Sequence, residues 1–344
     1  MDYLVEWADP SREGVREEIT RFLALSGLEL DRQAELTLTV RYGTLLAAAG
    51  SLAGNTLRSI AVAPEHQGGN CLNVLVGRLL EILDRQGRHP AFVFTKPEAA
   101  LSFERLGFYR VAGTGEAVLL ENSPTALDSY LKGLASSRRE GAPVGAIVMN
   151  GNPFTRGHLH LVETACRECA HVHLLAVETE ASSFPFADRF SLMAQGTAHL
   201  KNLTLHRGGD YIISEATFPR YFLREPGQAA RAQAELDIRL FGARIGPALG
   251  VTHRYMGQEP YCETTRSYNE TMQRLLPEYG ITAVEIPRLE DAQGPISASR
   301  VRRALSAGDA GALAALVPES TLRFLLSPGG EAVRQALQLG DGRH

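Results

Sequence analysis

The sequence predicts an α/β protein with two domains, an α+β domain followed by a domain built on a parallel sheet. Three observations lead to this prediction. The chain has 344 residues, which is long enough for two hydrophobic cores. Its first part carries closely spaced strand patterns around short turns, whereas its second part alternates apolar strands with helices. Between them lies a stretch rich in Pro, Gly, Ser and Arg, so we expect domains at residues 1–122 and 144–344, joined at 123–143 by a linker with a short helix.

The first domain is expected to contain antiparallel strands and amphipathic helices. Two strand patterns flank a turn at Gly43, which is typical of a hairpin, and a third strand pattern ends at Pro64. A helix with Leu75, Leu79 and Leu83 on one face follows. The expected strands are residues 36–42, 45–49, 57–63, 91–95 and 108–112, and a further helix covers residues 98–106.

The second domain is expected to be a parallel sheet covered by helices on both faces. The predicted strands are residues 144–149, 171–177, 203–206, 252–256 and 283–286, and the predicted helices begin at 157, 190 and 229. In sheets of this kind, ligands bind at the carboxyl ends of the strands.

Two segments about 140 residues apart carry the pattern of a nucleoside triphosphate site: AIVMNGNPFTRGH at 146–158 and ISASRVR at 296–302. The first is a strand, a tight turn and the start of a helix, so backbone N–H groups of the turn approach a phosphate. We expect His158, Thr155 and Arg302 to act on the reacting phosphates, and Ser297 to cap a helix. The expected nucleotide-binding residues are Asn150, Gly151, Asn152, Pro153, Phe154, Gly157, Ser297 and Ser299. Taken alone, 296–302 also fits an ordinary capped surface helix.

Composition excludes several classes of protein. The formal net charge is −4, which argues against broad binding to nucleic acid or to an anionic membrane. No apolar run is long enough to span a bilayer, and the first residues lack the pattern of a secretory signal. With only 4 cysteines there is no disulfide framework, so we expect a cytoplasmic protein.

No protein-built metal site is expected. Cys166 and Cys169 recur at helical spacing with apolar residues, so we interpret both thiols as core residues. His171 and His173 lie in an alternating strand pattern, which we interpret as a solvated face or edge of the sheet.

The first domain resembles the GNAT acetyltransferases. The resemblance rests on the order of its elements, on VAPEHQG at 62–68 and on FERLGFY at 103–109. In that family a glycine-rich loop holds the pyrophosphate of acetyl-CoA at a helix N-terminus. Here Asn70 and Leu72 stand where the family has small residues, so two interpretations stay open: an acyl-CoA site, or a module for docking or stability.

The second domain resembles the HxGH nucleotidyltransferases, a Rossmann-like superfamily, with Thr155 in place of the first His of the motif. The segments between the motifs narrow this further, and the whole chain is similar to the citrate lyase ligase family. They are FPFADR at 184–189, DYIIS at 210–214, ATFPRYF at 216–222, GQEPYC at 257–262 and YNE at 268–270.

This resemblance implies an AMP-forming acid–thiol ligase. Its substrates are ATP, acetate and the CoA-like prosthetic-group thiol of the acyl carrier subunit of citrate lyase, and an acetyl-adenylate is the intermediate. Mg²⁺ held mainly by the phosphates fits this chemistry. Two alternatives remain: an adenylyltransferase acting on a nucleotide or pantetheine-type acceptor, and a non-catalytic ATP-binding regulatory subunit.

A few residues between the motifs are open to two interpretations. Arg189 either reaches the phosphates or forms a surface pair with Asp188. The aromatic residues of 218–222 either wall the acetate pocket or form core. Glu259 and Tyr261 follow a strand end, where we expect adenine or ribose contacts.

Overall fold

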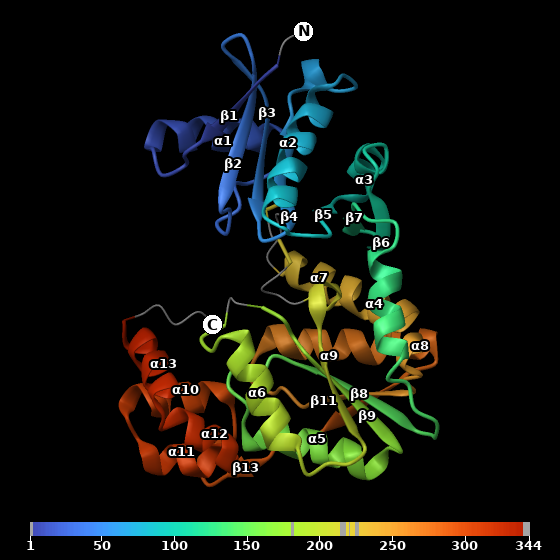
Figure 1. The fold of residues 1–344 in the computed structure, drawn as a ribbon, viewed down its shortest axis with the longest axis vertical. Helices are drawn as coiled ribbons and strands as arrows, with labels where there is room; N and C mark the ends of the chain where they lie inside the picture. The colour runs from blue at the N-terminus through green and yellow to red at the C-terminus, as the bar shows by residue number, and fades with distance from the viewer. Residues whose placement is uncertain (1–2, 180–181, 214–217, 220, 224–226, 340–344) are drawn as a thin grey trace. The chain divides into compact units, whose positions relative to one another are not determined.

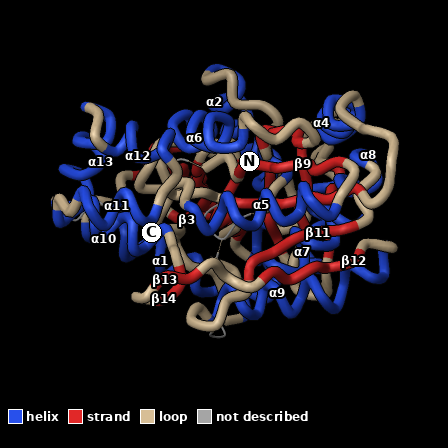
Figure 2. The backbone as a smooth tube through the Cα atoms, turned by 90° about the horizontal axis from the view of Figure 1, so that it is seen from below, coloured by secondary structure: helices blue, strands red, loops and turns tan. Residues whose placement is uncertain are grey.

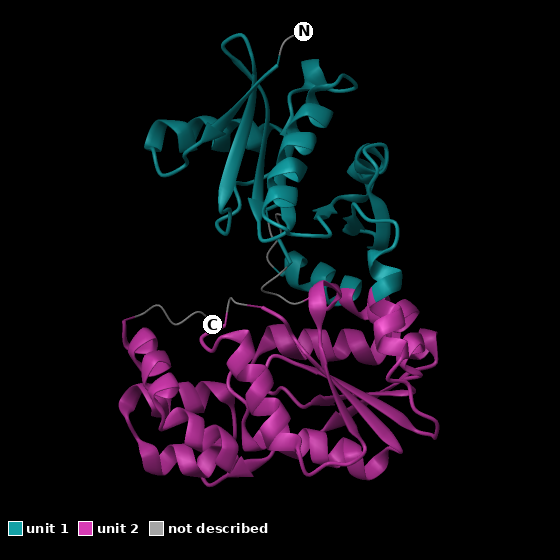
Figure 3. Cartoon of the chain, viewed as in Figure 1, with its two compact units in different colours: residues 1–129, 218–236 teal, residues 130–217, 237–344 magenta. Residues whose placement is uncertain are grey.

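The computed structural model describes residues 3–179, 182–213, 218–219, 221–223 and 227–339. The chain divides into two compact units, residues 1–129 with 218–236, and residues 130–217 with 237–344 (Figure 3). The predicted α/β fold class is confirmed, with an α+β unit and a unit built on a parallel sheet. Of the predicted motif segments, Ser214, residues 216–217 and Arg220 lie outside the described residues.

Unit 1 is built on a seven-stranded sheet in the order β1-β2-β3-β4-β5-β7-β6 (Figure 1). Its strands are β1 (Leu4–Ala8), β2 (Leu36–Tyr42), β3 (Leu45–Ala53), β4 (Thr56–Val62), β5 (Phe92–Thr95), β6 (Tyr109–Gly113) and β7 (Val118–Glu121). Its helices include α1 (Glu13–Leu25), α2 (Cys71–Arg85) and α3 (Pro97–Glu104). The pairs are antiparallel except β4 with β5. The sequence patterns missed β1 and β7, which are short.

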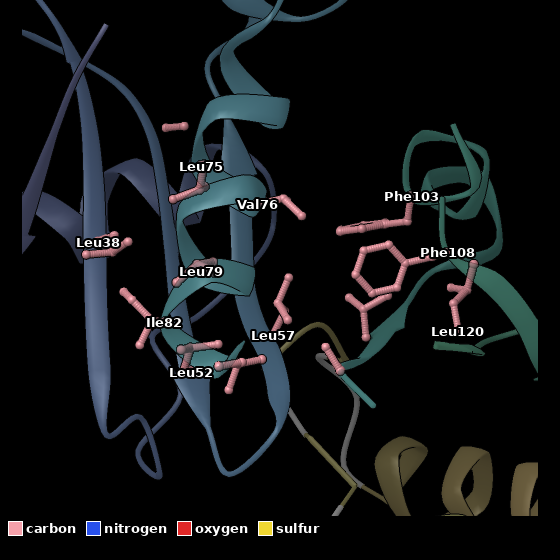
Figure 4. Close-up of a cluster of buried hydrophobic side chains, with 14 of the residues drawn as sticks. Leu38, Leu52, Leu57, Leu75, Val76, Leu79, Ile82, Phe103, Phe108 and Leu120 are labelled. Carbon is pink, nitrogen blue, oxygen red and sulfur yellow. The ribbon is translucent and has the colours of Figure 1, made fainter. Parts of the chain in front are cut away.

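The core of unit 1 lies between α2 and the sheet. Leu75, Leu79 and Ile82 of α2 are buried, as their spacing predicted, and they belong to one cluster with Leu38 and Leu57 of the strands (Figure 4). Because each buried side chain of this kind contributes about 1.5–3 kcal/mol, this face is what holds the helix on the sheet.

Unit 1 also contains a segment from late in the chain, residues 218–236. The ring of Phe218 lies edge-on to Phe94 with centroids 5.3 Å apart, and the Tyr221 hydroxyl donates to the Phe94 carbonyl at 3.1 Å. The predicted boundaries 1–122, 123–143 and 144–344 therefore differ from the observed division, because aromatic packing draws this segment into the first unit. Phe218, Tyr221 and Phe222 are buried here, which agrees with the core interpretation and not with an acetate pocket in the second unit.

Unit 2 contains a five-stranded parallel sheet in the order β10-β9-β8-β11-β12. Its strands are β8 (Val144–Met149), β9 (His171–Ala176), β10 (Leu203–Arg207), β11 (His253–Gly257) and β12 (Thr282–Ile286), and a small hairpin adds β13 (Glu290–Asp291) and β14 (Gly294–Pro295). Its helices are α5 (Arg156–Glu168), α6 (Phe186–Thr197), α8 (Gly246–Leu249), α9 (Glu263–Leu275), α10 (Ala298–Ala307), α11 (Ala310–Leu316), α12 (Glu319–Leu325) and α13 (Pro328–Gln338). Two further helices, α4 (Ala126–Ala135) and α7 (Gln228–Leu240), cross the division between the units.

Helices cover both faces of this parallel sheet, which is drawn in red in Figure 2. Neighbouring residues of β11 show this, since Tyr255 bonds Glu168 of α5 while Arg254 bonds Tyr268 of α9. Successive side chains of a strand point to opposite faces, so α5 and α9 lie on opposite sides.

The interpretation of His171 and His173 as solvated was wrong. Every residue of β9 is buried, and His173 has no exposed surface. Its Nδ1 lies 3.0 Å from Nε2 of His206, and His171 bonds Thr204 at 2.9 Å. A strand inside a parallel sheet is covered on both faces, so its polar residues must find partners within the protein.

Cys169 is buried in the core cluster of unit 2, and Cys166 packs against that cluster, as their spacing predicted. Among the described helices, none combines the length and the apolarity that crossing a lipid bilayer requires.

Candidate functional site

The parallel sheet of unit 2 opens between β8 and β11. These strands pair at two positions, Gly145 with His253 and Ala146 with Arg254, whereas β8 and β9 pair at six. The strands therefore part toward their carboxyl ends, where parallel sheets bind ligands. A cavity of about 570 Å³ lies at this opening. It is lined by residues of β11, α5, α9 and α10 and of the segment after β12.

The N-terminus of α5 forms one wall of this cavity. Thr155 is the N-cap, and its hydroxyl accepts the backbone N–H of His158 at 3.2 Å. In return, Nδ1 of His158 accepts the backbone N–H of Thr155 at 3.1 Å. This reciprocal pair satisfies N–H groups that the first turn of a helix leaves unpaired, and it locks the orientation of the imidazole.

The capping contact also decides which nitrogen of His158 carries the proton. Since Nδ1 accepts a hydrogen bond from a backbone amide, the neutral ring carries its hydrogen on Nε2. Burial, followed by the charge of Arg288, lowers the pKa of His158 to about 4. At neutral pH the ring is therefore neutral, and Nε2 is a hydrogen-bond donor. The Phe154 ring stacks on this imidazole with the ring centroids 5.8 Å apart, which further restricts the orientation of the imidazole.

The second motif lies directly against the first. A Cβ atom on Gly157 would stand 2.6 Å from the carbonyl oxygen of Ile296, so only glycine allows this approach without displacing the backbone. Ser297 caps α10 by accepting the N–H of Arg300 at 3.3 Å, as predicted. Ser297 and Ser299 line the same cavity as Thr155, Gly157 and His158. The N-termini of α5 and α10 thus meet at one cavity, and both helix dipoles favour an anion there.

Arg302 joins the two motifs from the side of the cavity. Its Nη1 donates to the Asn152 carbonyl at 2.7 Å, and its Nη2 donates to the Ser299 hydroxyl at 3.3 Å. Partial burial lowers the pKa of Arg302, but a guanidinium stays charged at any physiological pH. Arg302 is not among the residues that line the cavity in this structure.

The loop of residues 150–154 supports the cavity without lining it. Asn152, Pro153 and Phe154 are buried, and Gly151 adopts a positive φ of 57°, where an added Cβ would meet the Met193 side chain. As direct nucleotide contacts, Asn150, Gly151, Asn152, Pro153 and Phe154 remain predictions. In the structure this loop leads directly into α5 and supports the first turn of that helix, which carries Thr155 and His158.

Arg189 holds this loop in place. It has no exposed surface, which excludes the surface pair with Asp188. Its Nη1 donates to the carbonyl and to the side-chain oxygen of Asn150, both at 2.7 Å, and its other nitrogens donate to the carbonyls of Phe184 and Thr179. A guanidinium engaged in this way ties several chain segments together and does not face the cavity.

The far side of the cavity carries Glu259, Tyr261 and Arg288. The sequence predicted nucleotide contacts for the first two but did not indicate Arg288. All three line the cavity. Arg288 donates to the Gln258 carbonyl at 2.6 Å and pairs with the Glu259 carboxylate, which also caps the turn before α9. Arg288 follows β12 by one proline, and a cation just after a predicted parallel strand was the signal that could have identified it.

The described residues contain no group of three or more His, Cys, Asp or Glu side chains arranged to hold a metal ion.

Residues 144–325 match the family model for the citrate lyase ligase C-terminal domain. A [citrate [pro-3S]-lyase] ligase of Klebsiella pneumoniae is 44% identical over 316 residues, which cover 90% of this chain and 92% of the relative. The corresponding ligase of Escherichia coli strain K12 is 40% identical, with 90% of this chain and 89% of the relative covered. That of Haemophilus influenzae is 39% identical, with 90% and 95% covered.

Proposed function

Because this chain belongs to the citrate lyase ligase family, we propose that it acetylates citrate lyase in an ATP-dependent, AMP-forming reaction. ATP, acetate and the prosthetic-group thiol of the lyase's acyl carrier subunit would yield AMP, pyrophosphate and the acetyl thioester. Family membership supports the ligase activity and the carrier as substrate. The geometry of the cavity supports the adenylation step.

One observation carries this proposal: the N-termini of α5 and α10 meet at a single cavity through the contact of Gly157 with the Ile296 carbonyl. A triphosphate needs donors along several phosphates at once. The Nε2–H of His158 suits the α-phosphate, while the N–H groups and hydroxyls at Ser297 and Ser299 suit the β- and γ-phosphates.

In the first step, an acetate oxygen attacks the α-phosphorus, the bond to the bridging oxygen breaks, and pyrophosphate leaves with the electron pair. Negative charge grows on the α-phosphate oxygens, and a fixed donor at His158 stabilises it more in the transition state than in bound ATP. The protein supplies no nucleophile in this step, so positioning and charge stabilisation account for catalysis.

In the second step, the thiolate of the carrier attacks the acetyl carbonyl carbon and AMP leaves, which forms the thioester. The thiol proton passes to solvent or to the leaving phosphate.

Mg²⁺ bound by the triphosphate would neutralise part of its charge and orient it. The residues around the cavity are compatible with such an ion, because the serine hydroxyls and helix N–H groups would bind phosphate oxygens, while phosphates and water would hold the metal.

The test incubates the protein with ATP, Mg²⁺ and labelled acetate, with and without thiol-form citrate lyase. We expect label on the carrier and one AMP per acetyl group. Formation of a stable dinucleotide-like product without acetate would favour an adenylyltransferase for a nucleotide or pantetheine-type acceptor. Nucleotide binding with no pyrophosphate release would favour a regulatory subunit.

A further inference from the structure

The far wall of the cavity carries a guanidinium with a donor that no described residue uses. Arg254 and Arg288 are the arginines among the described residues that line the cavity, and no lysine accompanies them. Arg254 is 2% exposed, and its charge is paired inside the protein. The Arg288 side chain is 25% exposed; its Nε donates to the Gln258 carbonyl at 2.6 Å, and its Nη2 pairs with Glu259. Its Nη1 bonds none of the described residues and is not enclosed by protein, so it is available to a ligand.

The carboxylate that pairs with Arg288 is shared with a helix. Glu259 Oε1 accepts the backbone N–H groups of Tyr261 and Cys262 at 3.1 and 3.2 Å, where the chain enters α9. The positive end of a helix dipole stabilises a carboxylate in this position, so Glu259 takes up only part of the charge of Arg288. The two side chains together carry no net charge, which suits a singly charged ligand better than a polyanionic phosphate chain. The phosphates have donors of their own at the N-termini of α5 and α10.

Backbone contacts hold Arg288 and His158 at the same site. The N–H of Ile296 donates to the Leu289 carbonyl at 2.9 Å, and a Cβ on Gly157 would stand 2.6 Å from the Ile296 carbonyl oxygen. Leu289 directly follows Arg288 in the chain. Gly157 directly precedes His158, so these contacts fix the spacing of the two residues. In the sheet β11 lies between β8 and β12, so the carboxyl ends of β8 and β12 are about 10 Å apart. Ligand groups can fill this span, and the charge of Arg288 acts on His158 across it.

We propose that Arg288 binds the carboxylate of acetate and holds it beside the α-phosphate that His158 contacts. In this arrangement Nη1 donates to one acetate oxygen, and the other oxygen faces the α-phosphorus. Attack brings two anions together, and a guanidinium on the carboxylate offsets their repulsion. The methyl group lies toward Pro287 and Leu289, which flank Arg288 and also line the cavity. The inference rests on the proposed function in that the acid is acetate.

The first test measures binding of acetate without turnover. The protein is loaded with Mg²⁺ and α,β-methylene-ATP, which cannot release pyrophosphate, and saturation-transfer NMR follows the acetate methyl group. Arg288→Met should weaken acetate binding by about 10- to 100-fold, the cost of one hydrogen bond from a charged donor. It should bind α,β-methylene-ATP as tightly as the unmodified protein does. Unchanged acetate binding, or an equal loss of nucleotide binding, would overturn the proposal.

Two further variants separate ligand binding from support of the cavity wall. Glu259→Gln keeps an acceptor for Arg288 and for the N–H groups at the start of α9. It should bind acetate at least as tightly as the unmodified protein, because it removes a negative charge near the carboxylate. If it instead weakens acetate binding as Arg288→Met does, Arg288 only supports the wall. Arg323→Met is the matched control, since Arg323 pairs with Glu319 on α12 and is 74% exposed; its acetate binding should be unchanged.

Turnover identifies the step at which Arg288 acts. Arg288→Met should raise the KM for acetate in pyrophosphate release, while acetyl transfer from synthetic acetyl-adenylate to thiol-form citrate lyase keeps its normal rate. An equal loss with acetyl-adenylate would contradict a role in holding acetate. If the unmodified protein binds acetate beside α,β-methylene-ATP but transfers no acetyl group, the proposed function fails while this site stands. If it transfers acetyl groups and Arg288→Met keeps the normal KM for acetate, the site fails while the function stands.

Discussion

Gly157→Ala offers the sharpest test of the contact between the two motifs. The added Cβ would stand 2.6 Å from the Ile296 carbonyl oxygen, where an ordinary carbon–oxygen contact is about 3.3–3.6 Å. The backbone cannot rotate away as a side chain would, so α5 and the segment before α10 must move apart by about 0.7–1.0 Å. Misplacement of reacting groups by about 1 Å costs on the order of 10²-fold in rate, and we expect kcat/KM to fall by that amount.

Stability should change much less than activity. Overpacking costs about 1–3 kcal/mol, while alanine is favoured over glycine inside a helix by about 1 kcal/mol. The difference is a loss of about 0–2 kcal/mol, small enough for a domain of ordinary stability to remain folded. Urea unfolding measures this loss in the free energy of unfolding, and pyrophosphate release measures the rate of adenylation.

Gly77→Ala is the matched control. Gly77 lies within α2, and a Cβ there would meet nothing within 4 Å. This variant should keep full activity and gain slightly in stability. Normal pyrophosphate release by Gly157→Ala, or an equal loss in Gly77→Ala, would refute the argument that the two motifs must touch.

Three further predictions concern side chains. His158→Ala should slow adenylation by roughly 10²–10³-fold with circular dichroism unchanged, since it removes one transition-state donor; a near-normal rate would contradict its role. Arg302→Ala should raise the KM for ATP and lower kcat while the protein stays folded, because the Asn152 carbonyl and the Ser299 hydroxyl lose the guanidinium that joins the two motifs; unfolding of this variant would instead assign Arg302 to structure alone. Burial lowers the pKa of His173 to about 3 and that of His206 to about 4. The unfolded chain then binds more protons below pH 6.5, so the free energy of unfolding should fall as pH decreases from 6.5 toward 4, by up to about 1.4 kcal/mol per unit for each ring. Urea unfolding between pH 7 and 4.5 measures this slope, His173→Leu should flatten it, and an unchanged slope in that variant would exclude His173 as its source.

Local sequence determined most of the elements and the core of the site. Strands β8, β10 and β12 and the buried face of α2 follow from their periodicity, and the cap at Ser297 follows from residue type. The nearness of Gly157 and His158 to the second motif was predicted from the motifs together. The strands, the helix face and the cap depend on a few neighbouring residues, so they can be predicted from the sequence pattern.

The tertiary structure decided which polar residues face the cavity. Arg189 and Arg254 are both buried arginines, yet the first is bonded by backbone carbonyls, while the second bonds the Tyr268 hydroxyl and pairs with Asp237. Only the fold reveals that Asp237 and Tyr268 stand beside Arg254. It also assigned residues 218–236 to the first unit and placed His173 in the interior of a sheet. The residue type alone fixes the charge of a side chain and its number of hydrogen-bond donors and acceptors. Its partners come from distant parts of the chain, so only the fold determines which of those donors and acceptors are bonded inside the protein.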